Sequence, residues 1–400
     1  MNRMARMARG LLLMFTLFAI CSLQGCKDYN ELNDLALVDM VGVDLNEDGT
    51  YQAYYQVLNP NGVAGSKTGS FRSPLFTFEF RGKSWPEFTR LATQTLSRKL
   101  FINHFQAYIV SERLAKHGIG DLLNFLESDP RRRMATSIYV TKSPIKDIMN
   151  TYVPMETNPG KELRSIQKLQ YEVTGQSDNK SNLKTLLENF ENEQLAYISM
   201  IKLTDQEPFM TTKRFQTIEG NRGNFQYVGA SIIKQAHAIG ELKAPQLSTL
   251  FFLLGTNKSL LQDLKWNESE SAQIQMIGKP KTDYQLFLQH GQPKLDIRIK
   301  PSLELVTIDQ EEKLDSKTLR RLEAMFDKKM EDQSIKLIKL ANEKQWDLLG
   351  IQDRIAKRIN PKWATLKSNP VAWMETDVSV TVHSSIIKTG TLLTPYKGGK

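Results

Sequence analysis

Two hydrophobic periodicities alternate along the first half of the chain. Residues 35–43 form an apolar run that is typical of a buried strand, and residues 76–80 alternate apolar and polar side chains with the period of a strand. Ser84, followed three residues later by a glutamate, has the spacing of a capping box and predicts the start of a helix. Further strands over 105–110 and 134–140, each followed by a helical segment, predict βαβ-type units with helices packed on a sheet.

The second half shows the same two periods over longer stretches. Residues 273–277, 295–299 and 377–382 alternate apolar and polar side chains and predict half-exposed strands. A long helix is expected over 316–346, because apolar side chains recur at three- and four-residue steps: Leu319, Leu322, Phe326, Met330, Leu337 and Ala341. We expect the opposite face of this helix to be solvated: Lys328, Lys329, Glu331, Asp332 and Lys336.

These elements predict a multi-domain protein of mixed α+β and α/β class. The chain is longer than one hydrophobic core usually serves, so we expect three domains, each a mixed sheet with packed helices. The predicted ranges are 26–204 for an N-terminal α/β domain, 205–300 for a middle domain and 301–400 for a C-terminal domain that contains the long helix. The polar, loop-rich stretch after residue 204 marks the first boundary.

The first 25 residues have the pattern of a secretory signal. Three arginines precede an apolar run over residues 10–23, which is too short to cross a bilayer. The run ends in Leu23-Gln24-Gly25-Cys26, which resembles a bacterial lipobox. We therefore expect cleavage before Cys26 and lipidation of that residue, as an S-diacylglycerol thioether with an N-acyl chain if present. The alternative is an ordinary secreted protein in which Cys26 is incidental.

The chain has a positive net charge and two cysteines. Removal of the three signal arginines lowers the formal net charge from +9 to +6, and Cys21 leaves with the signal. The densest basic cluster is Arg131, Arg132 and Arg133, which either forms a solvated loop or contacts anionic headgroups or an acidic partner. The cluster is not interleaved with aromatic side chains, so no nucleic-acid partner is expected.

No residue pattern predicts an active site. The five histidines do not have the spacing of metal ligands, and the motifs of nucleophilic hydrolases and nucleotide-binding loops do not occur. Residues 44–49 match the first half of a calcium loop, but the twelfth position is Tyr55 rather than glutamate, so a hairpin turn is the favoured interpretation. We predict a protein that is not an enzyme and has no metal, cofactor or catalytic residue.

Several segments in their order resemble the C subunit of bacterial spore germinant receptors, the Ger(x)C lipoprotein family. They lie behind the lipobox at residues 30–38, 41–44, 56–60, 104–112, 121–126, 227–230 and 240–242, then at Trp363, Val378, Val380, Val382, Ile386 and Gly390. The chain departs from the family at Lys27-Asp28-Tyr29, where the family usually continues its cysteine with tryptophan and aspartate.

The resemblance implies three α/β-type domains and a position on the outer face of the spore inner membrane. It also implies assembly with two integral-membrane subunits into a nutrient-responsive receptor, with a non-enzymatic role in assembly or signal relay. Of the family's functional residues, only Cys26 carries over. Two alternatives are a lipid-anchored solute-binding protein that serves a transporter, with two lobes and an aromatic cleft, and an envelope hydrolase with clustered histidines or carboxylates.

Overall fold

The computed structural model describes most of the chain after residue 33. The described residues are Met7, Met14, Glu31, 34–59, 73–103, 105–130, 132–177, 181–205, 208, 210–212, 223–267, 270–309 and 314–390. Cys26, Arg131 and His104 lie outside them.

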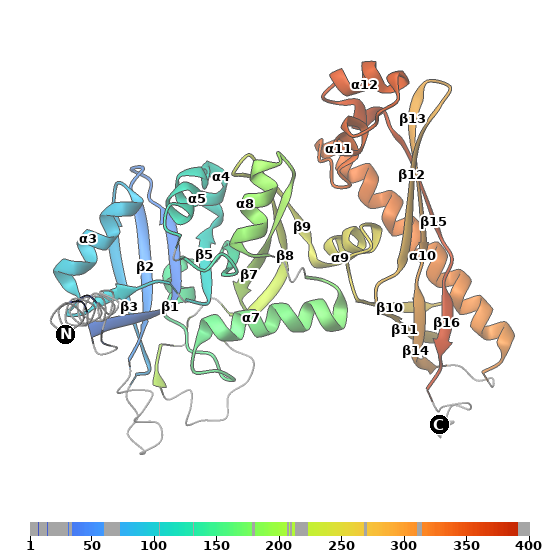
Figure 1. The fold of residues 1–400 in the computed structure, drawn as a ribbon. Coiled ribbons are helices and arrows are strands. Elements are labelled where there is room, and N and C mark those ends of the chain that lie inside the picture. Colours follow the sequence, from blue (N-terminus) through green and yellow to red (C-terminus); the bar gives the residue numbers. More distant parts are fainter. Residues whose placement is uncertain are drawn as a thin grey trace, which may run out of the picture.

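A nine-stranded mixed sheet organises the N-terminal half (Figure 1). Its order is β3 (Leu75–Gly82), β2 (Tyr51–Leu58), β1 (Leu35–Leu45), β5 (Ala107–Ser111), β6 (Ser137–Thr141), β7 (Ala196–Leu203), β8 (Phe225–Lys234) and β9 (His237–Lys243), with β4 (Lys99–Phe101) paired to β1. The four central strands β1, β5, β6 and β7 are parallel, and antiparallel strands flank them on both sides. The parallel centre confirms the predicted βαβ organisation.

Helices cover both faces of this sheet. Successive side chains of β1 point to opposite faces and are therefore buried against helices on both sides. Val41 and Val43 pack towards α3 (Trp85–Thr95), α4 (Glu112–His117), α5 (Gly120–Glu127) and α8 (Leu183–Glu191). Met40 and Gly42 face α6 (Ile145–Met149) and α7 (Pro159–Leu169). A Cβ at Gly42 would lie 2.6 Å from Cγ2 of Ile145, so glycine permits the close approach of α6.

The predicted boundary at residue 204 falls inside this sheet. β8 pairs antiparallel with β7 along its length, and β9 pairs with β8. A polar stretch that connects two antiparallel strands resembles an interdomain linker in sequence, which explains the difference.

The C-terminal half contains two smaller sheets and the long helix. One sheet has the order β10 (Ser259–Lys265), β11 (Ser271–Ile277), β14 (Ser302–Asp309) and β16 (Ser385–Lys388). The other has the order β12 (Lys281–Gln289), β13 (Gln292–Lys300) and β15 (Asp377–Val382). Both sheets combine strands from before and after residue 300, so the predicted boundary at 300 and 301 does not separate two sheets.

Helix α10 (Ser316–Lys344) is the long helix that the sequence predicts. Its N-cap is Asp315, whose carboxylate accepts a hydrogen bond from the Thr318 amide at 2.7 Å. Its buried stripe packs in one hydrophobic core with strands of both small sheets. The other helical segments of this half are α9 (Ala244–Leu253), α11 (Ile351–Ala356), η4 (Pro361–Trp363), α12 (Ala364–Ser368) and η5 (Ala372–Glu375).

Three carboxylates on α10 bind the segment between β15 and β16. Oε1 of Glu331 accepts from the Val382 amide at 2.9 Å, and Oδ1 of Asp327 accepts from the Ser384 amide at 3.0 Å. One turn earlier, Oε1 of Glu323 accepts from the Ile386 amide at 2.7 Å. The prediction that Glu331 belongs to a solvated face is therefore wrong, because this carboxylate is a half-buried acceptor for backbone amides.

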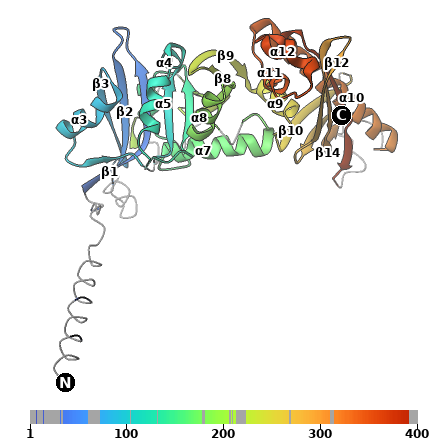
Figure 2. The same ribbon diagram turned by 45° about the horizontal axis from the view of Figure 1, so that its top comes forward.

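The two halves lie side by side, as both ribbon views show (Figures 1 and 2). Helix α7 runs along the lower side of the nine-stranded sheet towards the second half, and a short π-helical turn, η2 (Gln170–Thr174), continues it. This turn contacts β10. The mixed, multi-domain class that the sequence predicts is confirmed.

Candidate functional site: the junction between the halves

The first contact between the halves joins η2 to β10. The Ser259 hydroxyl of β10 donates to the Val173 carbonyl at 2.7 Å. Gly175 ends the turn with a φ of 64°, and a Cβ there would lie 2.0 Å from the Ser259 carbonyl oxygen. Only glycine allows both this backbone conformation and this approach, so the position fixes the end of the α7–η2 rod against the second half.

The second contact joins the loop after α10 to the edge of the nine-stranded sheet. The Trp346 indole packs on Gly240 of β9, where a Cβ would lie 2.1 Å from Cζ2 of the ring. The Tyr197 hydroxyl of β7 donates to the Leu348 carbonyl at 3.2 Å. Burial raises the pKa of Tyr197, so the phenol remains a neutral donor at physiological pH.

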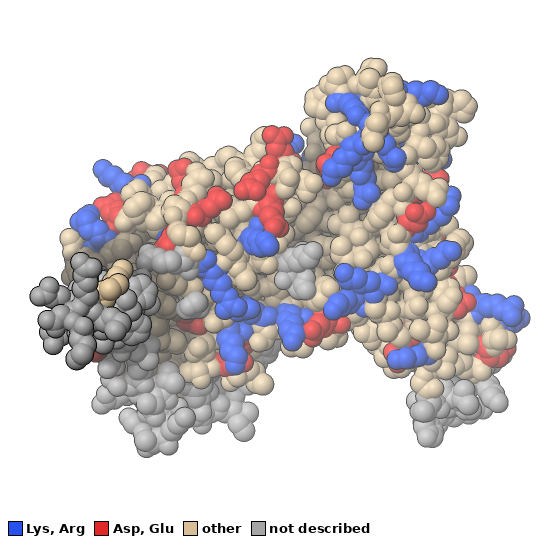
Figure 3. All heavy atoms as spheres, viewed as in Figure 1, with Lys and Arg blue, Asp and Glu red and all other residues tan. Residues whose placement is uncertain are grey.

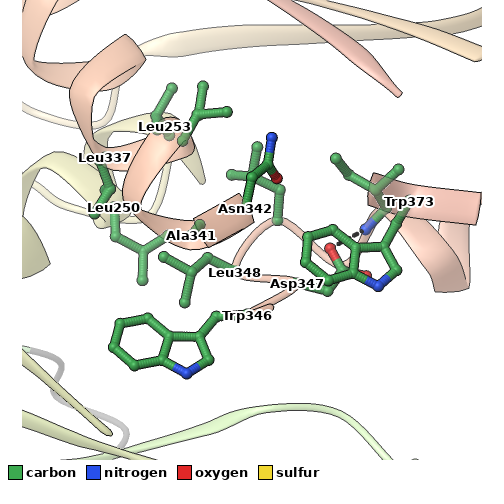
Figure 4. Close-up of a pocket in the computed structure, with 12 residues that line it drawn as sticks. Leu250, Leu253, Leu337, Ala341, Asn342, Trp346, Asp347, Leu348 and Trp373 are labelled. Carbon is green, nitrogen blue, oxygen red and sulfur yellow. Dashed lines mark hydrogen bonds between the residues drawn. The ribbon is translucent and has the colours of Figure 1, made fainter. Parts of the chain in front are cut away.

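The interior of this second contact is apolar and nearly filled. Its lining includes Leu250, Ala341, Trp346, Leu348 and Trp373, and Figure 4 shows the two indoles on opposite sides of the cavity. The free volume is about 20 Å³, which accommodates about one water molecule and no amino acid or sugar. The junction is therefore a packed contact rather than the aromatic cleft that a solute-binding protein requires.

One carboxylate stiffens the loop at this cavity. Asp347 lies at this cavity (Figure 4) and accepts hydrogen bonds from the backbone amides of Ile351 and Gln352, each at 2.8 Å. These bonds anchor the start of α11. Burial raises the pKa of Asp347, and these two amide hydrogen bonds oppose the shift. The two hydrogen bonds of Asp347 thereby fix the loop that carries Trp346 and Leu348 to the start of α11.

The basic cluster, for which the sequence leaves open a solvated loop or an interaction surface, is divided by the structure between interior and solvent. Arg132 is 8% exposed, with its guanidinium carbon 4.2 Å from the centre of the Phe125 ring and one terminal nitrogen 3.4 Å from the Tyr108 hydroxyl. Its Nε has no hydrogen-bond partner among the described residues. Arg132 is thus part of the domain interior, and Arg133 is the described member of the cluster that is exposed to solvent.

The segment that resembles half of a calcium loop forms a turn between two strands. Residues 44–49 form the expected hairpin, since Leu45 of β1 pairs with Tyr51 of β2. Arg113 forms an ion pair with Asp44 at 2.9 Å.

Asp39 is a buried carboxylate that the sequence alone did not predict to be functional. It lies in β1 and accepts a hydrogen bond from the Gly160 amide at 2.9 Å. Burial raises the pKa of Asp39 from 3.8 to about 6.

The part of the chain that the structure describes has neither a metal-ligand cluster nor a membrane-spanning helix. Within it, no group of three or more His, Cys, Asp or Glu side chains is arranged to hold a metal ion. None of the helices described there is long and apolar enough to cross a membrane.

The fold thus defines a multi-domain, mixed α/β protein whose two halves are joined by a packed junction. The chain belongs to the GerAC family of spore germination proteins. The model of the spore germination protein N-terminal domain matches residues 28–203, and the model of the B3/GerAC-like C-terminal domain matches residues 228–390. These matches support a germinant receptor C subunit with a role in spore germination, which confirms the resemblance seen in the sequence.

Individual relatives cover both halves. Spore germination protein KC of Bacillus subtilis (strain 168) is 23% identical, over 97% of this chain and 97% of that protein. Spore germination protein A3 of the same strain is 26% identical, over 62% of this chain and 61% of that protein. The crystal structure of the GerBC protein is similar with a TM-score of 0.56 and 19% identity, over 87% of this chain and 96% of that chain. It has the same fold.

Proposed function

We propose that the mature chain is a lipid-anchored, non-enzymatic subunit of a nutrient germinant receptor. It acts in assembly or signal relay with two integral-membrane subunits on the outer face of the spore inner membrane. The observation that carries this proposal is the match of both halves, in order, to the two GerAC domain models. The lipobox-like segment before Cys26 supports the anchor.

The packed junction suggests how such a subunit relays a signal. Contacts at two separated places, η2 on β10 and Trp346 on β9, resist both bending and twisting of one half against the other. A displacement imposed on one half by a bound partner is then transmitted to the other half as a rigid-body movement.

The anchor is tested by membrane fractionation and N-terminal peptide mass in spores that carry Cys26→Ala. We expect the acyl mass to disappear and the protein to leave the membrane fraction, because its tether is lost. Cys21→Ala, the same substitution inside the signal, is the matched control and should leave both readouts unchanged. A Cys26→Ala protein that stays fully in the membrane fraction would show that protein partners, not lipid, retain it.

The partners are tested by purification of the epitope-tagged chain from detergent-solubilised spore membranes. The proposal predicts that both integral-membrane subunits copurify with it. Purification of the anchored chain without either subunit would contradict the proposed assembly.

A further inference from the structure

The hairpin of β12 and β13 presents an unpaired sheet edge. In the sheet order β12-β13-β15, strand β12 is terminal. Leu288 of β12 lies opposite Pro293, which has no N–H and cannot exchange two hydrogen bonds with its partner. Leu288 and Pro293 therefore form a non-hydrogen-bonded pair. Because hydrogen-bonded and non-hydrogen-bonded pairs alternate along an antiparallel ladder, the backbone N–H and C=O groups of Tyr284, Leu286 and Leu288 point away from β13.

A hydrogen bond to this outer side confirms that orientation. One terminal nitrogen of Arg358 donates to the Leu286 carbonyl at 2.7 Å. No backbone–backbone hydrogen bond from another described segment reaches the outer side of Tyr284, Leu286 or Leu288. A row of free backbone groups beside apolar side chains is the feature that natural sheets usually shield, by charge, proline or a covering element.

Beside this edge lies a groove of about 540 Å³. One wall is formed by Leu286, Phe287 and Leu288, and the other by residues 357–363. The groove exposes large apolar side chains, since Ile359 is 97% exposed and Phe287 is 38% exposed. Exposed apolar side chains that gather in one groove are a feature of protein-interaction sites.

The charge around the groove is positive. Its lining contains Lys357, Arg358 and Lys362 and no carboxylate. Lys357 pairs with Asp353 at 2.7 Å, whereas Arg358 and Lys362 form no ion pair with a described residue. Figure 3 shows Lys and Arg atoms gathered over the lobe in which α11 and α12 lie.

We infer that this groove binds an extended, acidic segment of a partner protein, which adds to β12 as a further strand. The Leu286 amide and both backbone groups of Leu288 supply main-chain hydrogen bonds, and the groove accepts apolar side chains. Lys362 attracts carboxylates, as does the Arg358 guanidinium, which also donates to the Leu286 carbonyl. A lipid surface is a poorer fit, because free backbone N–H and C=O groups are costly in hydrocarbon, where they find no hydrogen-bond partners.

The test measures binding of a fluorescein-labelled peptide that alternates glutamate and valine, by anisotropy, to the full mature chain in detergent. We expect saturable binding that weakens at high salt, and none by a peptide that alternates lysine and valine. Lys362→Glu should weaken binding about tenfold or more, since it replaces attraction with repulsion. Lys367→Glu is the matched control on α12, outside the groove lining, and should bind as the wild type does.

A backbone variant tests the added strand itself. Leu288→Pro removes one outward N–H at a position that does not bond to β13, so the hairpin can persist while peptide binding falls about tenfold. Absence of binding by the glutamate peptide, or equal weakening by Lys362→Glu and Lys367→Glu, would overturn the inference. Lys362-dependent binding to phosphatidylglycerol vesicles, with no peptide binding, would identify the surface as a lipid contact and would also overturn it.

Discussion

Truncation of Trp346 should uncouple the two halves of the molecule. The indole is 8% exposed and packs directly on Gly240 of β9, so it belongs to the core of the C-terminal half and also touches the N-terminal sheet. A buried tryptophan removes about 200 Å² from water, worth about 5 kcal/mol at about 25 cal/mol per Å². Its replacement by alanine also leaves a cavity, and such substitutions cost about 3–5 kcal/mol.

The assay is urea unfolding followed by hydrogen exchange of peptides from β6 and from β13. In the wild type we expect both strands to lose protection at the same urea concentration, because the junction couples their cores. In Trp346→Ala, β13 should unfold at lower urea than β6. Trp363→Ala is the matched control, since Trp363 is 5% exposed but lies in the lobe of α11 and α12. Because the junction is intact in this variant, β6 and β13 should still lose protection together, at a lower urea concentration than in the wild type.

The results that would refute this reasoning are specific. If the two strands still lose protection together in Trp346→Ala, the indole does not couple the halves. If β13 also loses protection before β6 in Trp363→Ala, the effect is a general loss of stability in the C-terminal core rather than a loss of the junction.

Substitutions at two further positions test a buried and a half-buried carboxylate. Because the pKa of Asp39 is raised from 3.8 to about 6, its protonated form stabilises the fold below about pH 4, and that contribution is lost as pH rises through about 6. The unfolding free energy of Asp39→Asn should therefore match that of the wild type near pH 4. At pH 7.5 it should exceed the wild-type value by up to about 3 kcal/mol, at about 1.36 kcal/mol per pKa unit. A difference between the two proteins that does not depend on pH would contradict this cause. Asp327→Ala should cost about 1–3 kcal/mol in urea unfolding, because the Ser384 amide loses its acceptor, whereas Asp327→Asn keeps an acceptor and should cost less. Equal losses in the two Asp327 variants would show that the hydrogen bond is not the cause.

Local periodicity predicted the elements that have a strong amphipathic pattern. The stripe from Leu322 to Ala341 faces the core of the C-terminal half, because three- and four-residue steps place these side chains on one face of any helix. The strand over 35–43 lies near the middle of the nine-stranded sheet for a similar reason, since a continuous apolar run fits a strand that is covered on both faces.

Pairing between distant segments could not be predicted in this way. β15 pairs in parallel with β13, and β16 pairs in parallel with β14. In each pair one strand precedes α10 in the sequence and the other follows it, so no local pattern predicts the pairing. The predicted domain boundaries assume that neighbouring strands along the chain share a sheet, whereas each small sheet combines strands from both sides of residue 300.

The junction was hidden from sequence reasoning because its key residues are ordinary in isolation. Gly240 belongs to one of the segments that carry the family resemblance, but its role in the junction depends on a tryptophan that follows much later in the chain. Two patterns in the sequence do indicate buried acceptors. Asp39 is a lone carboxylate within an apolar strand, and Glu323, Asp327 and Glu331 recur every four residues on one side of α10.

The most direct test of the central claim is the germination of spores that lack this gene. Purified spores would be exposed to nutrients, class by class, and separately to a trigger that does not depend on nutrients. The account predicts loss of the response to one nutrient class, with the response to the other trigger retained, and restoration of the nutrient response when the wild-type gene is returned. Spores that respond normally to every nutrient class, when no second receptor gene set is present, would contradict a role for this chain in a germinant receptor.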